Sequence, residues 1–256
     1  RLKVFACYNF MKVFPNCYHI YFLSCLRRSK MIYYHNKVGE YMKYKVIFFD
    51  LDGTLTDPRE GIVNSIQYAA DYYGIKTEKQ DLLKYIGPPL KDTFKELLGE
   101  RYTDKLGEEA VSKYRERYAN GGIFENKIYP NVKETLALLK EKGFVLCTAS
   151  SKPQVYVKQI LEYFDIDKYF DYVGGATLDG KISRKEDVIN RGISDNGFSP
   201  DEILMVGDRK YDLTGAEKMK IDAVGVLYGF GSYKELSAEK SVALIDNIKQ
   251  LTDILK

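Results

Sequence analysis

The sequence predicts an α/β fold, in which a Rossmann-like parallel sheet carries helices on both faces and a small α-helical cap domain is inserted into it. The parallel sheet is predicted because short apolar runs alternate with longer segments whose apolar residues recur at helical spacing. The insertion is predicted because this alternation stops over residues 58–128, where helical patterns follow one another with no strand between them.

The first expected strand covers residues 45–50 and is apolar up to its last residue, Asp50. A helix is expected over 58–73, because apolar residues recur there at helical spacing and Pro58 suits a first helical turn. Burying a charge is costly unless the charge is paired, hydrogen-bonded or bound to a metal. A carboxylate at the end of so apolar a strand therefore suggests chemistry.

Three further helical segments are expected before the next strand, near 78–86, 90–98 and 104–119, and the sequence "NGG" at 120–122 ends the last of them. Ligands of open α/β sheets bind beyond the carboxyl ends of the strands. A helical block inserted directly after the first strand would therefore lie over such a ligand as a lid. The cap domain is predicted to comprise residues 58–128.

The alternation then resumes, so residues 42–57 and 129–256 together form the predicted α/β core domain. The remaining expected elements are helix 131–142, strand 144–149, helix 153–163, strand 170–174, helix 185–195, strand 202–207, helix 212–219, strand 221–227 and C-terminal helices. Strands separated in this way by helices are typical of one parallel sheet with both faces covered.

Residues 1–41 differ in composition from the rest of the chain. They contain both histidines, three of the four cysteines, and seven Lys or Arg residues against one acidic residue. They show neither a helical nor a strand period, so they have little to contribute to a packed core. We expect this N-terminal extension not to be part of the functional domain.

The composition of residues 42–256 excludes several classes of function. Of the 39 basic and 36 acidic residues of the chain, 32 and 35 lie here, so there is no basic excess to attract nucleic acid or a membrane. This part has no histidine and a single cysteine, Cys147, which excludes serine–histidine and cysteine–histidine hydrolases and a disulfide framework. Such cysteine usage fits a reducing compartment, and we expect a cytoplasmic protein.

Polar and charged side chains stand after three of the expected strands and at the head of one helix. They are Asp50-x-Asp52-Gly53-Thr54, Ser150-Ser151-Lys152-Pro153, Lys185 and Gly207-Asp208-x-x-x-Asp212. Each alone has a structural explanation, because Asp-Gly is a common turn pair, serine can cap a helix, and acids favour a first helical turn. Together they would converge on one edge of the sheet, where the carboxyl ends of parallel strands lie.

This set resembles the haloacid dehalogenase-like (HAD) hydrolase superfamily, and more closely its phosphoglycolate phosphatase and 5′-nucleotidase-like branch with a helical cap. The resemblance covers about residues 43–256. It rests on the D-x-D-G-T motif after an apolar strand and on the G-D-x-x-x-D motif, with weaker support from the serine of "SSKP" and from Lys185. Relatives often have threonine where Ser150 stands, and Thr148, earlier in the same strand, is the alternative.

The resemblance implies a Mg²⁺-dependent phosphatase that hydrolyses small phosphorylated metabolites, such as phosphoglycolate or nucleoside monophosphates, through an aspartyl-phosphate. Asp50 would be the nucleophile, and Asp52 would protonate the leaving oxygen and then deprotonate the attacking water. The ligands of Mg²⁺ would be Asp50, the main-chain carbonyl of Asp52, and Asp208, while Asp212 would orient waters or those ligands without binding the metal. A carboxylate that attacks an anionic phosphate needs such a positive charge nearby.

The phosphate would be held by main-chain amides and by side chains, with Lys185 pairing with both Asp50 and the phosphate. The substrate-binding residues would be Thr54, Ser150, Ser151 and Lys185. In the cap, Lys91 and Arg59 are candidates for contact with the leaving group, although solvation at the surface is the better explanation of each residue.

Other functions use a similar set of residues. A phosphosugar mutase of the same superfamily, similar to β-phosphoglucomutase, would use all of them, whereas a haloacid dehalogenase would leave Asp52 and Asp208 without a task. A receiver-like signalling domain would use an acceptor aspartate, a hydroxyl and a lysine, but it would not need a lid. A non-catalytic interaction protein would not need so complete a set. The expected partner is a small phosphorylated metabolite, with no nucleic acid or membrane, bound by a monomer or homodimer.

Overall fold

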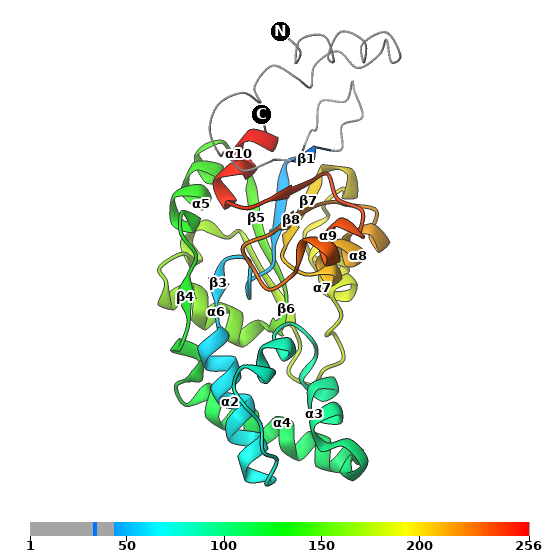
Figure 1. Ribbon diagram of the computed structural model, residues 1–256. Coiled ribbons are helices and arrows are strands. Elements are labelled where there is room, and N and C mark those ends of the chain that lie inside the picture. The colour runs from blue at the N-terminus through cyan, green and yellow to red at the C-terminus, as the bar shows by residue number, and fades with distance from the viewer. Residues whose placement is uncertain (1–32, 35–43, 256) are drawn as a thin grey trace, which may run out of the picture. The chain divides into compact units, whose positions relative to one another are not determined.

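The computed structural model describes residues 33–34 and 44–255, and it confirms the predicted α/β fold (Figure 1). In these residues the main sheet has the strand order β1-β9-β8-β7-β2-β5-β6. Neighbouring strands are parallel except for β1, which is antiparallel to β9. The strands are β1 (Tyr33–Tyr34), β2 (Val46–Phe49), β5 (Val145–Pro153), β6 (Tyr172–Ala176), β7 (Ile203–Gly207), β8 (Asp222–Val226) and β9 (Ala243–Ile245).

Strand β2 lies in the middle of the sheet, paired with β5 on one side and β7 on the other. Its side chains alternate between the two faces, as a strand requires. Ile47 and Phe49 belong to one apolar cluster, and Val46 and Phe48 belong to the other. All four are buried, so the strand is a rigid support on which Asp50 follows directly.

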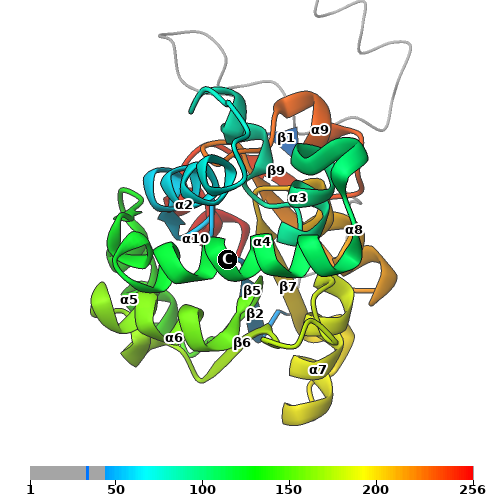
Figure 2. The ribbon, with the colours of Figure 1, turned by 90° about the horizontal axis from the view of Figure 1, so that it is seen from below.

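Helices cover both faces of this sheet, as predicted. On one face, α5 (Val132–Glu141), α6 (Gln154–Tyr163) and α10 (Leu251–Ile254) bury apolar side chains in the cluster of Ile47. On the other face, α7 (Lys185–Asn196) and α8 (Lys210–Lys218) pack into the cluster of Val46. Figure 2 shows α5 and α6 on one side of the strands and α7 and α8 on the other. The short elements of the core are α9 (Tyr233–Ser237), η4 (Asp167–Tyr169), η5 (Pro200–Glu202) and η6 (Ile248–Gln250).

The block of residues 58–128, here called the cap, is helical. Its elements are α2 (Arg59–Tyr72), η1 (Asp81–Tyr85), α3 (Leu90–Leu98), η2 (Gly99–Arg101), α4 (Asp104–Ala119) and η3 (Gly122–Phe124). The chain reaches and leaves it through an antiparallel ribbon, in which β3 (Thr56–Asp57) pairs with β4 (Lys127–Ile128). In Figure 1 the cap helices lie at the end of the sheet where β2 leads into β3, which is the carboxyl end of the parallel strands.

Two stretches of the core differ from the expectation. Residues Ala243–Ile245 form a strand within a segment that was expected to be helical, because three residues are too few to establish a period. Strand β5 continues to Pro153 and so includes the "SSKP" sequence, which was expected to follow the strand. The two-residue strands β3 and β4 were not predicted either, for the same reason of length.

The prediction for residues 1–41 falls mostly outside the described residues and stays a prediction. Tyr33 and Tyr34 are described, and they pair in register with Leu244 and Ala243. In the described part of the chain, no helix is both long and apolar enough to cross a membrane.

Gly61 in helix α2 has no room for a side chain, because a Cβ added there would lie 1.9 Å from the carbonyl oxygen of Gly122 in η3. Replacing glycine by alanine inside a helix normally stabilises it by about 1 kcal/mol. Here the backbone contact should reverse that sign, and we expect Gly61→Ala to lower the thermal midpoint by about 5 °C. Thermal unfolding followed by circular dichroism measures it, with the exposed neighbour Glu60→Ala as the control expected to change little. A midpoint raised by Gly61→Ala would show that α2 and η3 separate without cost.

Candidate active site

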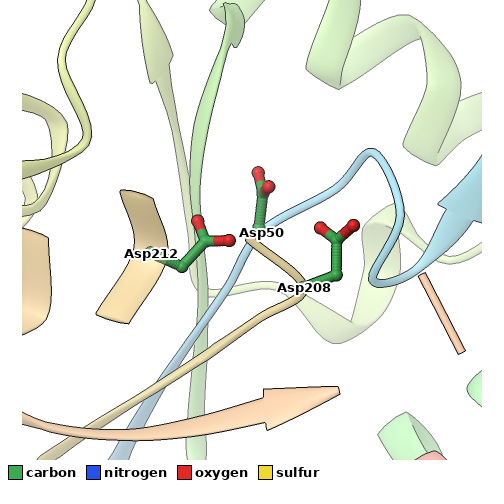
Figure 3. A group of neighbouring side chains, drawn as sticks. All are labelled: Asp50, Asp208 and Asp212. Carbon is green, nitrogen blue, oxygen red and sulfur yellow. The ribbon is translucent and has the colours of Figure 1, made fainter. Parts of the chain in front are cut away.

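Three buried carboxylates meet at the carboxyl edge of the sheet. Asp50 directly follows β2, Asp208 directly follows the neighbouring strand β7, and Asp212 lies in the first turn of α8. One oxygen of each lies within 4.8 Å of the others. Figure 3 shows the three side chains gathered at the ends of these segments. They converge because the parallel pairing of β2 with β7 brings both strand ends to the same edge.

Lys185, the first residue of α7, places its ammonium group against two of these carboxylates. Its Nζ lies 2.9 Å from Asp50 Oδ1 and 2.7 Å from Asp212 Oδ1. It also donates a hydrogen bond of 2.8 Å to the main-chain carbonyl of Ala149 in β5. Burial lowers the pKa of Lys185, but Asp212 and Asp50 outweigh burial and raise this pKa above its ordinary value. The lysine is therefore a permanent positive charge.

Asp208 is fully buried in a shell of main chain and glycine. One carboxylate oxygen accepts a hydrogen bond of 2.7 Å from the main-chain N–H of Phe230, and Thr54 Oγ1 lies 3.4 Å from the other. A Cβ added at Gly53 would lie 2.1 Å from this carboxylate, and one added at Gly229 would lie 2.4 Å from its Cβ. Burial, and then the charges of the neighbouring Asp212 and Asp50, raise the pKa of Asp208 well above its ordinary value.

Asp212 has a structural contact as well as an electrostatic one. Its Oδ2 accepts a hydrogen bond of 2.9 Å from the main-chain N–H of Arg209, which caps the start of α8. Burial raises the pKa of Asp212 to about 6, and the nearby Lys185 limits this rise.

The donor set fits a divalent cation that prefers oxygen ligands. Three carboxylates face a single ammonium group, so two negative charges remain without a partner when all three acids are ionised. Like charges at this separation repel one another. This repulsion adds to burial in raising the pKa of Asp208 and of Asp212. Mg²⁺ favours carboxylate and carbonyl oxygens and carries the charge that the cluster lacks.

Asp52 lies beside this cluster and has a different partner. Its Oδ2 forms an ion pair of 2.8 Å with Nζ of Lys152, which is itself largely buried. Its Oδ1 is buried and accepts no hydrogen bond from the described residues. Burial raises the pKa of Asp52, and Lys152 only partly offsets this rise. A carboxyl group with a raised pKa is better suited to donate a proton than an ordinary aspartate.

The residues that form this site belong to a stretch that matches a known family. A model of the haloacid dehalogenase-like hydrolases matches residues 47–226, which is more than half of the chain. The chain belongs to this family. The recognition of the family from its motifs is thereby confirmed.

Several proteins similar to this chain are named as phosphatases or as a nucleotidase. The 5′-nucleotidase of Pseudomonas aeruginosa is 38% identical over 218 residues, which cover 84% of this chain and 97% of the relative. The phosphoglycolate phosphatase of Haemophilus influenzae is 31% identical, with 83% of this chain and 99% of the relative covered. The crystal structure of a predicted phosphatase from Clostridium acetobutylicum has 41% identity and a TM-score of 0.79, covering 83% of this chain and 98% of that one. This chain is therefore a hydrolase of the haloacid dehalogenase-like family, similar to these proteins.

The serine positions of this HAD-like hydrolase lie on β5, next to β2 in the sheet. Ser150 is buried, and its Oγ accepts a hydrogen bond of 3.3 Å from the main-chain N–H of Lys152. Thr148 donates its hydroxyl proton to the carbonyl of Gly174 over 2.8 Å within the sheet, so this proton is already engaged. Ser151 is half-buried.

The cap of the HAD-like fold is hydrogen-bonded to the core beside the carboxylates through Tyr118 and Ile86. Lys152 of the core donates a hydrogen bond of 2.7 Å to the hydroxyl of Tyr118 in α4. Arg209, which follows Asp208, donates from Nη1 to the main-chain carbonyl of Ile86 over 2.6 Å. Lys152 is the ion-pair partner of Asp52, and Arg209 is the residue after Asp208. The cap therefore contacts residues that adjoin two of the acids.

The two cap residues named as candidates have different surroundings. The guanidinium group of Arg59 lies 5.5 Å from the ring centre of Phe230, whose N–H binds Asp208. Lys91 forms an exposed ion pair of 3.1 Å with Asp104 inside the cap. Both residues therefore have an acidic partner, Asp57 at 3.5 Å for Arg59, but only Arg59 also lies near a segment that contacts the acid cluster.

Sequence reasoning assigned no role to Lys152 or to the "YGFGS" segment at 228–232. The segment has glycine at 229 and 231 because any side chain at Gly229 or Gly231 would collide with Asp208. The sequence did contain a signal for this close packing, namely Gly229 and Gly231 shortly after the buried strand β8. No pattern in the sequence showed that Lys152 would turn towards Asp52.

Proposed function

We propose that this chain is a Mg²⁺-dependent phosphatase of small phosphorylated metabolites that forms an aspartyl-phosphate on Asp50. The observation that carries the proposal is the cluster of Asp50, Asp208 and Asp212 around Lys185, buried at the carboxyl edge of the sheet. Such a cluster is unfavourable for stability, because burial and repulsion both oppose its charges. Its presence is best explained by a function that needs those charges.

In the proposed reaction, an oxygen of Asp50 forms a bond to phosphorus while the bond from phosphorus to the leaving oxygen breaks. Asp52 gives its proton to that oxygen, and as a base it then takes a proton from the water that hydrolyses the aspartyl-phosphate. Lys185 holds Asp50 in place and neutralises part of the phosphate charge. Ser150, Ser151 and Thr54 are proposed to complete the phosphate site with main-chain amides.

The groups proposed to hold Mg²⁺ are the carboxylates of Asp50 and Asp208 and the main-chain carbonyl of Asp52. When bound, the ion supplies positive charge that lets a carboxylate approach a phosphate and that stabilises the transferring oxygens. Asp212 is proposed to fix Lys185 and the start of α8 rather than to bind the metal, because its two oxygens already face Lys185 and the N–H of Arg209.

The cap is proposed to act as a lid that contacts the leaving group and excludes water. Its helices lie at the carboxyl edge, where they meet the core through Tyr118 and Ile86. The similarity to a 5′-nucleotidase makes nucleoside 5′-monophosphates the first substrates to test, with phosphoglycolate second. We also propose a cytoplasmic enzyme that acts alone or as a homodimer.

A substrate panel tests this proposal. The purified chain is given nucleoside 5′-monophosphates, phosphoglycolate and sugar phosphates with Mg²⁺, and phosphate release is measured. We expect one class to reach a kcat/KM of about 10⁴ M⁻¹ s⁻¹ or more, as is usual for an enzyme with its own substrate. Conversion of a sugar phosphate to its isomer without phosphate release would instead favour a mutase.

A further inference from the structure

We propose that Lys152 and the cap residue Tyr118 act as positioning residues that hold Asp52 in place for proton transfer to the leaving group. Lys152 of the core forms an ion pair with Asp52, and Tyr118 of the cap accepts a hydrogen bond from Lys152. This inference rests on the proposed function, in which Asp52 protonates the leaving oxygen. It adds a route by which a contact of the cap acts on the chemical step.

The contacts form a short chain from the cap to the acid. The hydroxyl of Tyr118 accepts a hydrogen bond of 2.7 Å from Lys152 Nζ. The same Nζ lies 2.8 Å from Asp52 Oδ2. The ammonium group also lies 4.6 Å from the centre of the Tyr118 ring, so the tyrosine offers both its oxygen and its π face. No residue other than Lys152 is needed to connect the cap helix to the acid.

Tyr118 and Lys152 are both held tightly by their surroundings. Tyr118 is 2% exposed, with its ring stacked on Tyr114 and edge-on to Tyr156 of α6. Lys152 is 9% exposed. A buried side chain fixed by packing holds its partner far more precisely than a solvated one, which is what a group for proton transfer requires.

The backbone of β5 explains why Lys152 points towards the acid. The register between β5 and β6 shifts between Ser150 and Pro153, so Ser151 and Lys152 form a bulge with no partners on β6. A bulge bends a strand and redirects its side chains, and bulges are common beside active sites. Here the bulge lies one residue beyond Ser150, where the strand ends at the carboxyl edge.

The two oxygens of Asp52 have different surroundings that match this role. Oδ2 is held by Lys152, whereas Oδ1 accepts no hydrogen bond in the described part of the chain. One oxygen is thus fixed and the other is left for a reacting proton. Lys185, not Lys152, is the lysine that contacts the carboxylate cluster. Lys152 is therefore placed to orient the acid rather than to neutralise the phosphate.

The test compares two aryl phosphates whose leaving groups differ in the need for a proton. Phenyl phosphate releases a phenol whose pKa is about 10, as for tyrosine, so it needs an acid. 2,4-Dinitrophenyl phosphate releases a stable anion that needs none. We expect Lys152→Met to lower kcat about 100-fold on phenyl phosphate but less than about 3-fold on the dinitrophenyl ester. Tyr118→Phe should lower kcat about 5-fold on phenyl phosphate only.

A double-mutant cycle separates positioning from a general structural effect. If Tyr118 acts through Lys152, then adding Tyr118→Phe to Lys152→Met should cause no further loss on phenyl phosphate. The matched controls are Tyr114→Phe, a buried tyrosine on the same helix, and Lys158→Met, an exposed lysine on α6. Both controls should keep wild-type rates on both substrates. Circular dichroism of each variant confirms folding, and Tyr118→Phe carries the test if Lys152→Met does not fold.

Asp52→Asn, measured in parallel, distinguishes a failure of this inference from a failure of the proposed function. If Asp52→Asn slows only phenyl phosphate while Lys152→Met slows both substrates equally or neither, the proposed acid stands and the positioning role is overturned. If Asp52→Asn itself does not discriminate between the substrates, the assigned acid is wrong and the inference falls with it. Additive losses in the cycle would also overturn the link between cap and acid.

Discussion

Replacement of Asp50 by asparagine should abolish turnover while leaving the fold intact. The amide has nearly the same shape as the carboxylate, so its packing at the end of β2 is retained, but it cannot form the proposed aspartyl-phosphate. Removing the nucleophile of an enzyme that works by covalent catalysis lowers kcat by a factor on the order of 10⁴–10⁶. Steady-state phosphate release measures the loss, and thermal unfolding measures the fold.

A trapping experiment tests the covalent step directly. Wild-type protein quenched in acid during turnover of a ³²P-labelled substrate should retain label, and Asp50→Asn should retain none. Asp187→Asn is the matched control, because this exposed aspartate lies on α7 two residues after Lys185. If Asp50→Asn kept a tenth of the wild-type rate in a folded sample, the proposed nucleophile would be wrong.

Replacement of Asp208 by asparagine should change activity and stability in opposite directions. Because burial and neighbouring acids raise the pKa of Asp208 in the folded protein, the folded state holds this proton more tightly than the unfolded chain. The stability gained below the ordinary pKa is therefore lost as pH rises through the raised pKa. At pH 8 without metal, the neutral amide should raise the thermal midpoint by about 3 °C, or about 1 kcal/mol. Activity should fall at least about 100-fold.

Metal addition should reverse that order of stability. Mg²⁺ that binds only the folded protein stabilises the wild type by about 2.7 kcal/mol at a concentration 100-fold above its Kd. We expect this rise in the wild type and in Asp187→Asn but not in Asp208→Asn, and we expect EDTA to stop turnover until Mg²⁺ is restored. Full activity after EDTA treatment, or an equal rise in Asp208→Asn, would remove Asp208 from the proposed metal site.

Several helices, and the edge of the sheet at which the acids meet, could be predicted from the sequence because apolar spacing is a local property. The helices at Leu90–Leu98 and Asp104–Ala119 agree with the expected ranges, since amphipathic spacing and a glycine stop define them within a few residues. The meeting of Asp50 with Asp208 followed from a general rule, that parallel strands bring their carboxyl ends to one edge. Lys185 lies at the same edge, because α7 begins there.

Other features depend on contacts that no local pattern contains. Lys152 reaches Asp52 only because of a bulge in β5, and the bulge reflects a shift of pairing with β6 rather than a property of "SSKP". Strand β9 is three residues long, and its pairing with β8 decides its conformation. The close packing of Gly229 on Asp208 joins segments that are 21 residues apart in the chain. Each of these depends on tertiary structure, which overrides local preference.

The ribbon of β3 and β4 makes the cap a replaceable module. Thr56 pairs with Ile128, and Asp57 pairs with Lys127, so the two chain ends of the cap lie side by side at one seam. A helical segment of different length or sequence needs only two neighbouring ends to be grafted there, and it leaves the strands that carry the acids unchanged. Exchange at that seam would change the segment over the carboxyl edge while Asp50, Asp208 and Asp212 stay in place, but a new segment would have to supply the contact that Tyr118 makes with Lys152.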